Sequence, residues 1–178
     1  MRLRPFTVAQ IFAMVEAGIL DEHDRVELIG GELVPMSPKG IRHERLKTWV
    51  MMQLAEKPPK SVAFTPGTTF TLSADTFLEP DFVVYDKTVG LEGLNGKTCL
   101  LAIEIGDSSL SYDRGRKAEI HAVFGIAELW VIDAVRLRTR IHRDPTPMGY
   151  RSVSDIETSA LLRPKSLPEA ALTLAEAD

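Results

Sequence analysis

The sequence has a single cysteine and contains no long apolar run. With Cys99 as the one cysteine among 178 residues, no disulfide can form within the chain. No apolar run approaches the roughly 18 residues that a membrane span needs. The N-terminal segment 1–7 is charged but has neither a long apolar stretch nor a small-residue cleavage site, so we expect no signal peptide. These absences lead us to expect a cytoplasmic protein with no membrane partner.

The chain also lacks the positive charge that is typical of dedicated nucleic-acid binders. It carries 21 Lys and Arg against 25 Asp and Glu, for a formal net charge of -4 at pH 7. Because Lys and Arg that neutralise phosphates supply most of the affinity of such binders, this balance argues against that class. It does not exclude an enzyme that cuts nucleic acid, which needs carboxylates at a metal ion and only a local basic surface.

The remaining composition is that of an ordinary globular domain. Hydrophobic residues make up 44% of the chain and charged residues 26%, which indicates neither disorder nor a fibrous fold. Domains typically run about 100 to 200 residues, so we predict one domain over 1–178 with its core at about 7–155. A C-terminal arm at about 159–178 is rich in Ala, Leu and Pro, and is either packed or loosely held.

Apolar periodicity and turn residues predict alternating helices and strands. Helices are expected from Thr7 to about residue 17, and at about 41–57 and 113–124. A hairpin is expected at 25–29 and 32–36, joined by Gly30-Gly31. Further strands are expected at 62–65, 68–72, 81–85, 100–105, 128–133, 137–142 and 150–153. This order predicts an α/β fold in which helices flank one mixed central sheet, with an N-terminal helix and hairpin.

Two carboxylates stand at buried strands. Asp81 comes directly before the apolar run 82–85, and Glu104 lies inside the apolar run 99–105. An ionised carboxylate there is costly unless a positive charge compensates it, and a divalent metal ion is the obvious candidate. Lys117 follows at the start of the next helix, which completes a nuclease-like set. Each residue also has a plainer reading: Asp81 in a turn, Glu104 at an exposed edge or beside an arginine, and Lys117 in solvent.

An ordered series of motifs resembles the Uma-two family. The motifs are the segment 26–33, then His43, Pro80-Asp81, the segment 103–114 with Lys117, and the segment 125–133. The resemblance runs from about residue 7 to 155. That family is placed among endonuclease-like proteins of the PD-(D/E)xK, or restriction-endonuclease-like, superfamily. The resemblance implies a core of helix, three strands, helix and strand.

The resemblance also implies metal-dependent hydrolysis of phosphodiester bonds in nucleic acid, with DNA as the expected substrate. Asp81, Glu104 and the backbone carbonyl of Ile105 would bind Mg²⁺ or Mn²⁺. Lys117 would orient the attacking water or stabilise charge on the phosphoryl oxygens. Similar enzymes carry this lysine two residues after the glutamate, where this chain has Gly106; in the Uma-two pattern it lies on the following helix.

Several further residues carry weaker signals. Glu27 lies near the metal or faces solvent, and His43 has a role in the site or belongs to helix packing. Three arginines alternate with other residues in the segment 136–143, which predicts a strand with all three on one face: Arg136, Arg138 and Arg140. That face either contacts the nucleic-acid backbone or is a solvated face that balances nearby acids.

A function of another class also stays open. Gly106 in place of the usual lysine allows a catalytically silent nucleic-acid-binding or assembly module that keeps the nuclease fold. Similar proteins of this size often act as dimers because two cuts need two sites, so we expect a homodimer or a higher homo-oligomer. The sequence does not choose between DNA and RNA.

Overall fold

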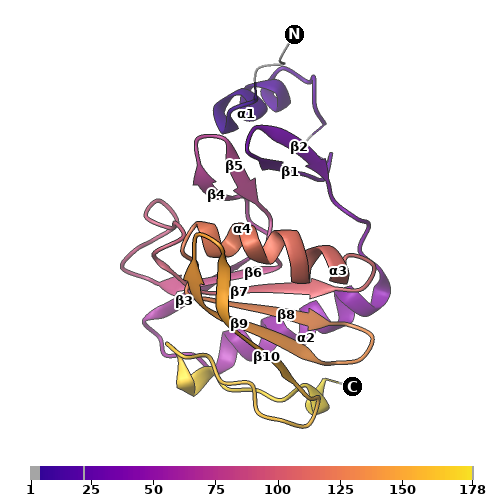
Figure 1. Ribbon diagram of the computed structural model, residues 1–178, viewed down its shortest axis with the longest axis vertical. Helices are drawn as coiled ribbons and strands as arrows, with labels where there is room; N and C mark the ends of the chain where they lie inside the picture. Colours follow the sequence, from indigo (N-terminus) through magenta and orange to yellow (C-terminus); the bar gives the residue numbers. More distant parts are fainter. Residues whose placement is uncertain (1–4, 22, 178) are drawn as a thin grey trace. The chain divides into compact units, whose positions relative to one another are not determined.

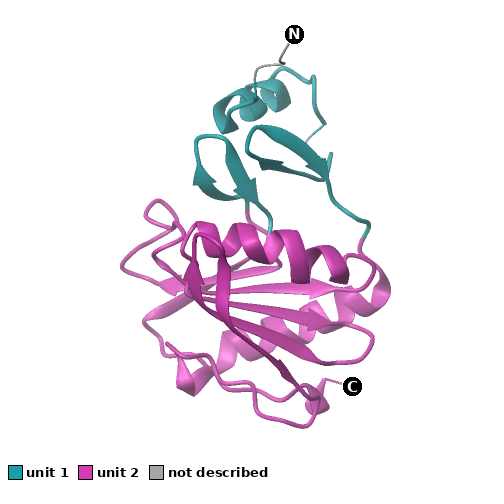
Figure 2. Ribbon diagram, in the orientation of Figure 1, with its two compact units in different colours: residues 1–38, 69–79 teal, residues 39–68, 80–178 magenta. Residues whose placement is uncertain are grey.

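The computed structural model describes residues 5–21 and 23–177, which divide into two compact units (Figure 2). Unit 1 consists of Met1–Pro38 and Thr69–Glu79, and unit 2 of Lys39–Thr68 and Pro80–Asp178. The expectation of a single domain stays a prediction, because compactness alone does not say whether two units unfold in one transition.

Unit 1 is one helix with a small antiparallel sheet. Helix α1 (Val8–Glu16) begins at a capping box between Thr7 and Gln10. The strands are β1 (Val26–Ile29), β2 (Glu32–Pro35), β4 (Phe70–Ser73) and β5 (Thr76–Leu78), in the order β2-β1-β5-β4. Gly30 and Gly31 have φ of 57° and 80°, as the predicted two-residue hairpin turn requires. The helix and sheet meet in a small core of Val8, Ile11, Leu28 and Phe77.

Unit 2 is built on a mixed sheet of six strands (Figure 1). These are β3 (Val62–Pro66), β6 (Phe82–Asp86), β7 (Cys99–Gly106), β8 (Glu128–Asp133), β9 (Thr139–Thr146) and β10 (Gly149–Ile156), in the order β10-β9-β8-β7-β6-β3. Strands β7 and β8 are parallel and every other neighbouring pair is antiparallel. A parallel pair needs a crossover, and helical turns supply it. The predicted mixed α/β sheet is confirmed.

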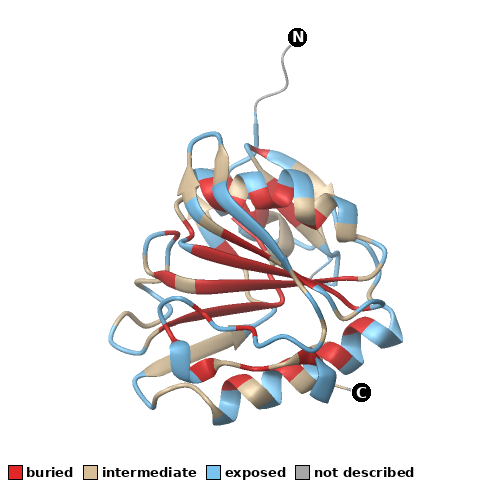
Figure 3. Cartoon of the chain, turned by 60° about the horizontal axis from the view of Figure 1, so that its bottom comes forward, coloured by how far each residue is buried: buried red, intermediate tan, exposed pale blue. Residues whose placement is uncertain are grey.

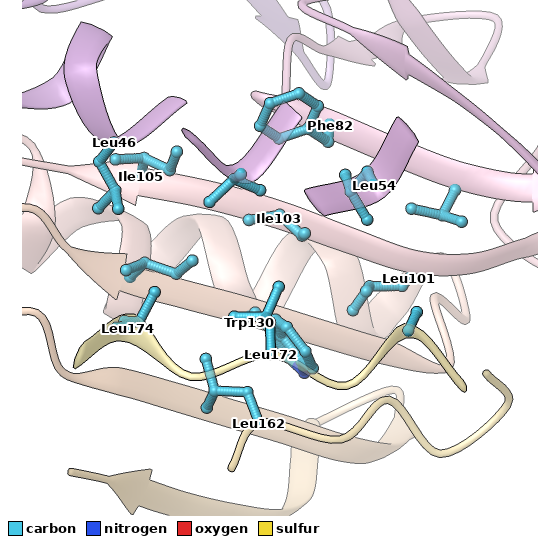
Figure 4. Packing of buried hydrophobic residues seen from close by; sticks show 14 of the residues in the cluster. Leu46, Leu54, Phe82, Leu101, Ile103, Ile105, Trp130, Leu162, Leu172 and Leu174 are labelled. Carbon is cyan, nitrogen blue, oxygen red and sulfur yellow. The ribbon is translucent and has the colours of Figure 1, made fainter. Parts of the chain in front are cut away.

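Opposite faces of this sheet meet different helices. Helix α2 (Ile41–Glu56) packs its buried stripe of Leu46, Val50 and Leu54 into the main apolar core. Figure 4 shows Ile103 and Ile105 of β7 in this core. Because successive strand side chains point to opposite faces, Glu104 between them points away from α2. It faces the crossover helix, where it contacts Lys117 and His121.

The C-terminal arm is packed, which decides between the two readings left open. Its apolar side chains join the main core: Leu162, Leu167, Ala170, Leu172 and Leu174. Polar contacts also hold it, because Glu128 accepts hydrogen bonds from the backbone N–H of Lys165 and from Arg143. The same guanidinium donates to the backbone carbonyl of Arg163. Burial is concentrated on the central strands, and several residues of this arm are buried as well (Figure 3).

The crossover helix differs from the predicted helix 113–124. It begins at Leu110 rather than Asp113, and consists of α3 (Leu110–Tyr112), a π-helical segment (Asp113–Lys117) and α4 (Ala118–Val123). Asp113 thus lies inside the helix, where it is buried and accepts a hydrogen bond from the Ser109 hydroxyl at 2.6 Å. The π turn adds a residue to the helical repeat, and Val123 in α4 is 55% exposed.

Candidate functional site

Asp81 lies immediately before β6 with its carboxylate buried among positive groups. Its Oδ2 accepts a hydrogen bond from the backbone N–H of Ile105 at 2.8 Å and lies 3.0 Å from His43 Nε2. Its Oδ1 lies 2.7 Å from Lys39 Nζ and 3.3 Å from Lys47 Nζ. Burial alone would raise the pKa of Asp81, but the hydrogen bond and charge of His43, and then Lys39, hold that pKa well below its usual range.

Helix α2 brings three basic side chains to Asp81. Lys39 directly precedes the helix N-cap, and His43 and Lys47 follow one turn apart on the same face. The His43 side chain is 4% exposed, whereas those of Lys39 and Lys47 are 20% and 19% exposed and so reach solvent. Burial lowers the pKa of Lys47 even though the charge of Asp81 opposes that shift. The ammonium of Lys47 also lies 5.9 Å from the centre of the Phe82 ring.

Glu104 lies in a second, more deeply buried cluster. Its Oε1 lies 3.0 Å from Lys117 Nζ and 3.1 Å from His121 Nε2. Lys117 ends the π-helical segment and His121 lies one turn later in α4, so both side chains share the face that meets the sheet. Lys117 is 3% exposed and His121 is fully buried. The plain reading of Lys117 as a solvated residue is therefore wrong.

Gly106, at the position where similar enzymes carry their lysine, has no room for a side chain. A Cβ atom there would lie 2.9 Å from the Cα of Leu110 and 3.1 Å from Oδ2 of Asp113. The first of these neighbours is backbone, which cannot move aside cheaply. A lysine at this position is therefore incompatible with the way the crossover helix begins.

The two candidates with weaker sequence signals, His43 and Glu27, lie in different units. His43 belongs to unit 2 and contacts Asp81, as described above. Glu27 belongs to unit 1, where it is 2% exposed and accepts a hydrogen bond from the backbone N–H of Glu79 at 2.8 Å. The reading of Glu27 as a solvent-facing hairpin residue is therefore wrong, because the residue is buried.

The three arginines do not form the predicted strand face. Leu137 has a φ of 52°, which ends the extended backbone, and β9 begins only at Thr139. Only one of the arginines lies in β9, and each is paired with an acid: Arg136 with Asp133 at 3.4 Å, Arg138 with Glu157 at 2.9 Å, and Arg140 with Asp155 at 2.8 Å. These pairs match the reading in which acids balance the arginines.

Sequence reasoning missed two groups of residues. Lys39 and Lys47 were not predicted, although Lys47 follows His43 at the four-residue spacing that places both on one helix face. On β9, Thr139 is fully buried and His142 is 5% exposed. Burial, followed by the charges of Arg140 and His121, lowers the pKa of His142 to about 4. The histidine is therefore neutral at pH 7.

The donor atoms suit a hard divalent ion. Within residues 5–21 and 23–177, no group of three or more His, Cys, Asp or Glu side chains is placed to hold a metal. Two carboxylates with one carbonyl need no such group, because Mg²⁺ takes oxygen ligands and keeps several waters. The N–H of Ile105 faces Asp81, and a strand residue directs its N–H and C=O to the same side. The carbonyl of Ile105 thus faces that side as well.

The fold and this arrangement define a restriction-endonuclease-like α/β protein. The model of the family described as "Uma2: Putative restriction endonuclease" matches residues 11–175, and the chain belongs to that family. A similar solved structure is that of "a putative nuclease belonging to DUF820 from Anabaena variabilis ATCC 29413". It has a TM-score of 0.76 and 16% sequence identity, over 97% of each chain, which shows a shared fold. The search of curated proteins returns no match.

Across the described ranges, every helix is too short or too polar to cross a bilayer.

Proposed function

We propose that this protein is a metal-dependent nuclease that hydrolyses phosphodiester bonds in nucleic acid, with DNA as its substrate. The observation that carries the proposal is the pair formed by Lys117 and Glu104, 3.0 Å apart and both buried. This contact supports the proposal because it pairs the strand glutamate with the helix lysine to which the family resemblance assigns the catalytic role. The crowding at Gly106 supports the same assignment, because it leaves the helix as the source of the cation.

Asp81, Glu104 and the backbone carbonyl of Ile105 would hold Mg²⁺ or Mn²⁺. Such an ion polarises the phosphate and acidifies a bound water. The chain supplies the remaining groups. His43 and the N–H of Ile105 hold the Asp81 carboxylate in its ionised form and fix its direction.

On the other carboxylate, the second contact from His121 restricts the rotation of Glu104. The ammonium of Lys117 then has a fixed position from which to stabilise negative charge on the phosphoryl oxygens. In the proposed reaction, water adds to phosphorus, the bond from phosphorus to the leaving oxygen breaks, and that oxygen departs with a proton.

Plasmid and single-stranded DNA incubated with Mg²⁺ or Mn²⁺ test the proposal. We expect cleavage by the parent protein and none by Asp81→Asn or Glu104→Gln, because each change removes a charged ligand while preserving shape. Calorimetric titration with Mn²⁺ should show the same loss of binding, and circular dichroism should show an unchanged fold. Glu119→Gln, an exposed change on the crossover helix, is the matched control.

If the parent cleaves neither DNA nor RNA above the level of these variants, the nuclease proposal is wrong. The catalytically silent module, which Gly106 allows, would then be the better assignment.

A homodimer or higher homo-oligomer belongs to the proposal, because cutting both strands of a duplex needs two sites. Sedimentation equilibrium at working concentrations should give a multiple of 19.7 kDa. A monomer that still makes double-strand breaks would contradict this part alone.

A further inference from the structure

Two lysines share one carboxylate oxygen of Asp81. Lys39 Nζ and Lys47 Nζ lie 2.7 Å and 3.3 Å from the same Oδ1 atom, while His43 and a backbone N–H take the other oxygen. One ammonium group would neutralise the carboxylate. The second brings two like charges together beside a single anion, which is costly unless a further anion joins them.

The two lysine side chains are partly exposed and flexible, whereas the histidine beside them is buried. Both side chains are about one-fifth exposed, at 20% and 19%, so each ammonium can turn to solvent without breaking the apolar core. Lysine carries a compact charge on a flexible four-carbon stem, and it binds phosphate as a point charge. The missing anion can therefore arrive from solution and meet both ammonium groups.

An ion held by Asp81 would compete directly with these lysines for its carboxylate. Once displaced, both ammonium groups would stay close to the site, because Lys39 directly precedes the N-cap of α2 and Lys47 lies within that helix. The local charge would then become more positive by the charge of the ion, in a place reached by solvent. A phosphate group of the nucleic-acid backbone is the anion that such a site would attract.

We propose that Lys39 and Lys47 bind a backbone phosphate of the nucleic-acid substrate. Without a divalent ion, Asp81 pairs with both lysines; binding of the ion to the Asp81 carboxylate releases them. The inference rests on the proposed function for the identity of the substrate. It assigns the two lysines to substrate binding, and it makes Asp81 the internal anion with which the phosphate competes.

The test measures binding of a short labelled duplex DNA in EDTA, as a function of salt. Without metal, Asp81→Asn should bind DNA more tightly than the parent, because it frees both ammonium groups. Its slope of log affinity against log salt should be steeper by about 0.9 for each lysine that then neutralises phosphate charge, or about 1.8 for both. Adding Lys39→Gln and Lys47→Gln to Asp81→Asn should return the slope to the parent value.

Two further variants separate charge from structure. Replacing both lysines by arginine in the Asp81→Asn protein should preserve the steep slope, since the charges remain. Lys60→Gln, at an exposed lysine of unit 2, is the matched control and should leave the slope unchanged. Calorimetry without DNA gives an independent readout: Lys39→Gln and Lys47→Gln should each bind Mn²⁺ more tightly than the parent, because the ion no longer displaces an ammonium group.

An Asp81→Asn slope equal to that of the parent would overturn the inference, as would a steep slope that survives loss of both lysines. Neither result depends on cleavage. If the parent cuts no nucleic acid but the slopes respond as expected, the nuclease proposal fails and the phosphate site stands. If the parent cuts DNA while the slopes do not respond, the phosphate site alone fails.

Discussion

Asp81 and Glu104 are equally buried, each 3% exposed, but the basic side chains beside them differ. The lysines on Asp81 reach solvent, whereas the Lys117 and His121 side chains on Glu104 are 4% and 0% exposed. A cation that can return to water leaves at little cost. Removing a fully buried cation leaves its partner charged and unpaired in the protein interior. The same kind of contact is thus exchangeable at one carboxylate and built into the core at the other.

Local structure explains the contrast. Glu104 lies in the middle of β7, and its neighbours Ile103 and Ile105 are anchored in the apolar core. Its side chain has one possible direction, toward the crossover helix. Asp81 lies in a bend before β6, where the chain of unit 2 begins its second segment, and it meets side chains from the start of α2. We infer that the lysines beside Asp81 exchange with ligands from solution, whereas Lys117 and His121 stay fixed beside Glu104.

The largest expected effect comes from removing the buried cation. Lys117→Met keeps the stem and loses the charge, so it should destabilise the protein by about 3 kcal/mol or more, as other broken buried pairs do. Lys39→Met should cost only about 1 kcal/mol or less, because the Lys39 ammonium already reaches solvent and Asp81 keeps its contacts with His43 and Lys47. Urea unfolding of the two variants measures the difference. Equal losses of stability would remove the distinction between the two clusters.

The same pair of variants should differ in activity. Lys117→Met should reduce Mn²⁺-dependent cleavage by about 10² or more, on the scale of other lost electrostatic stabilisers. Its affinity for Mn²⁺ should barely change, since an ammonium group is not a metal ligand. Calorimetry and plasmid cleavage, run on the same preparations, separate the two quantities. A large loss of Mn²⁺ affinity would mean that Lys117 acts by holding Glu104 in shape.

The neutral histidine on the Glu104 side gives the next largest effect. Burial lowers the pKa of His142 from 6.5 in the unfolded chain to about 4 in the fold. Between these values the unfolded state binds the proton and the native state does not, so stability falls as pH falls through this window. His142→Phe should remove this component, worth at most about 1.4 kcal/mol per pH unit. Urea unfolding from neutral to acid pH measures it, with exposed His23→Gln as control.

Asp81 should affect the pH dependence of stability in a more acidic range than His142. Asp81 contributes through its ionised carboxylate, whereas His142 contributes through its neutral ring. The pKa of Asp81 is 3.8 in the unfolded chain and lower in the fold, so its contribution is fully present above 3.8 and is lost as pH falls below that value. In Asp81→Asn this acid-dependent loss should be absent, and its stability should depend less on pH below about 4 than that of the parent. Equal acid profiles would indicate that His43, Lys39 and Lys47 do not hold the carboxylate ionised.

Much of the fold was predictable because its signals are local. Apolar runs located β6, β7 and β8, and the paired glycines located the first hairpin turn. The small sheet of unit 1 was not foreseen, because β5 has only three residues and is defined by its pairing with β1 and β4. A strand that short carries too little periodicity to be recognised on its own.

The candidate site was predictable for the residues that break a local pattern. Glu104 interrupts an apolar strand, and Asp81 precedes one. Lys39 and Lys47 interrupt nothing, since a lysine at a helix start or on a helix face is ordinary. Their convergence on one oxygen depends on how α2 packs against the sheet. The π turn that ends at Lys117 was equally hidden, because a π turn has no residue spacing that marks it in the sequence.

The smallest expected effect tests the arginines, which the sequence placed on one strand face. Contact with nucleic acid stays a prediction for Arg136, Arg138 and Arg140. Each is already paired with an acid, unlike the two lysines that share one carboxylate oxygen.

Replacing all three arginines by serine in the Asp81→Asn protein should therefore lower the salt slope of duplex DNA binding by less than about 0.9, which corresponds to less than one neutralised phosphate. The lysine pair should lower it by about 1.8 in the same assay. A loss near 2.7, or about 0.9 for each arginine, would show instead that the arginines lie along the DNA backbone. Substrate binding would then extend to β9. The exposure of the lysines beside Asp81 would no longer be enough to identify where the substrate phosphate binds.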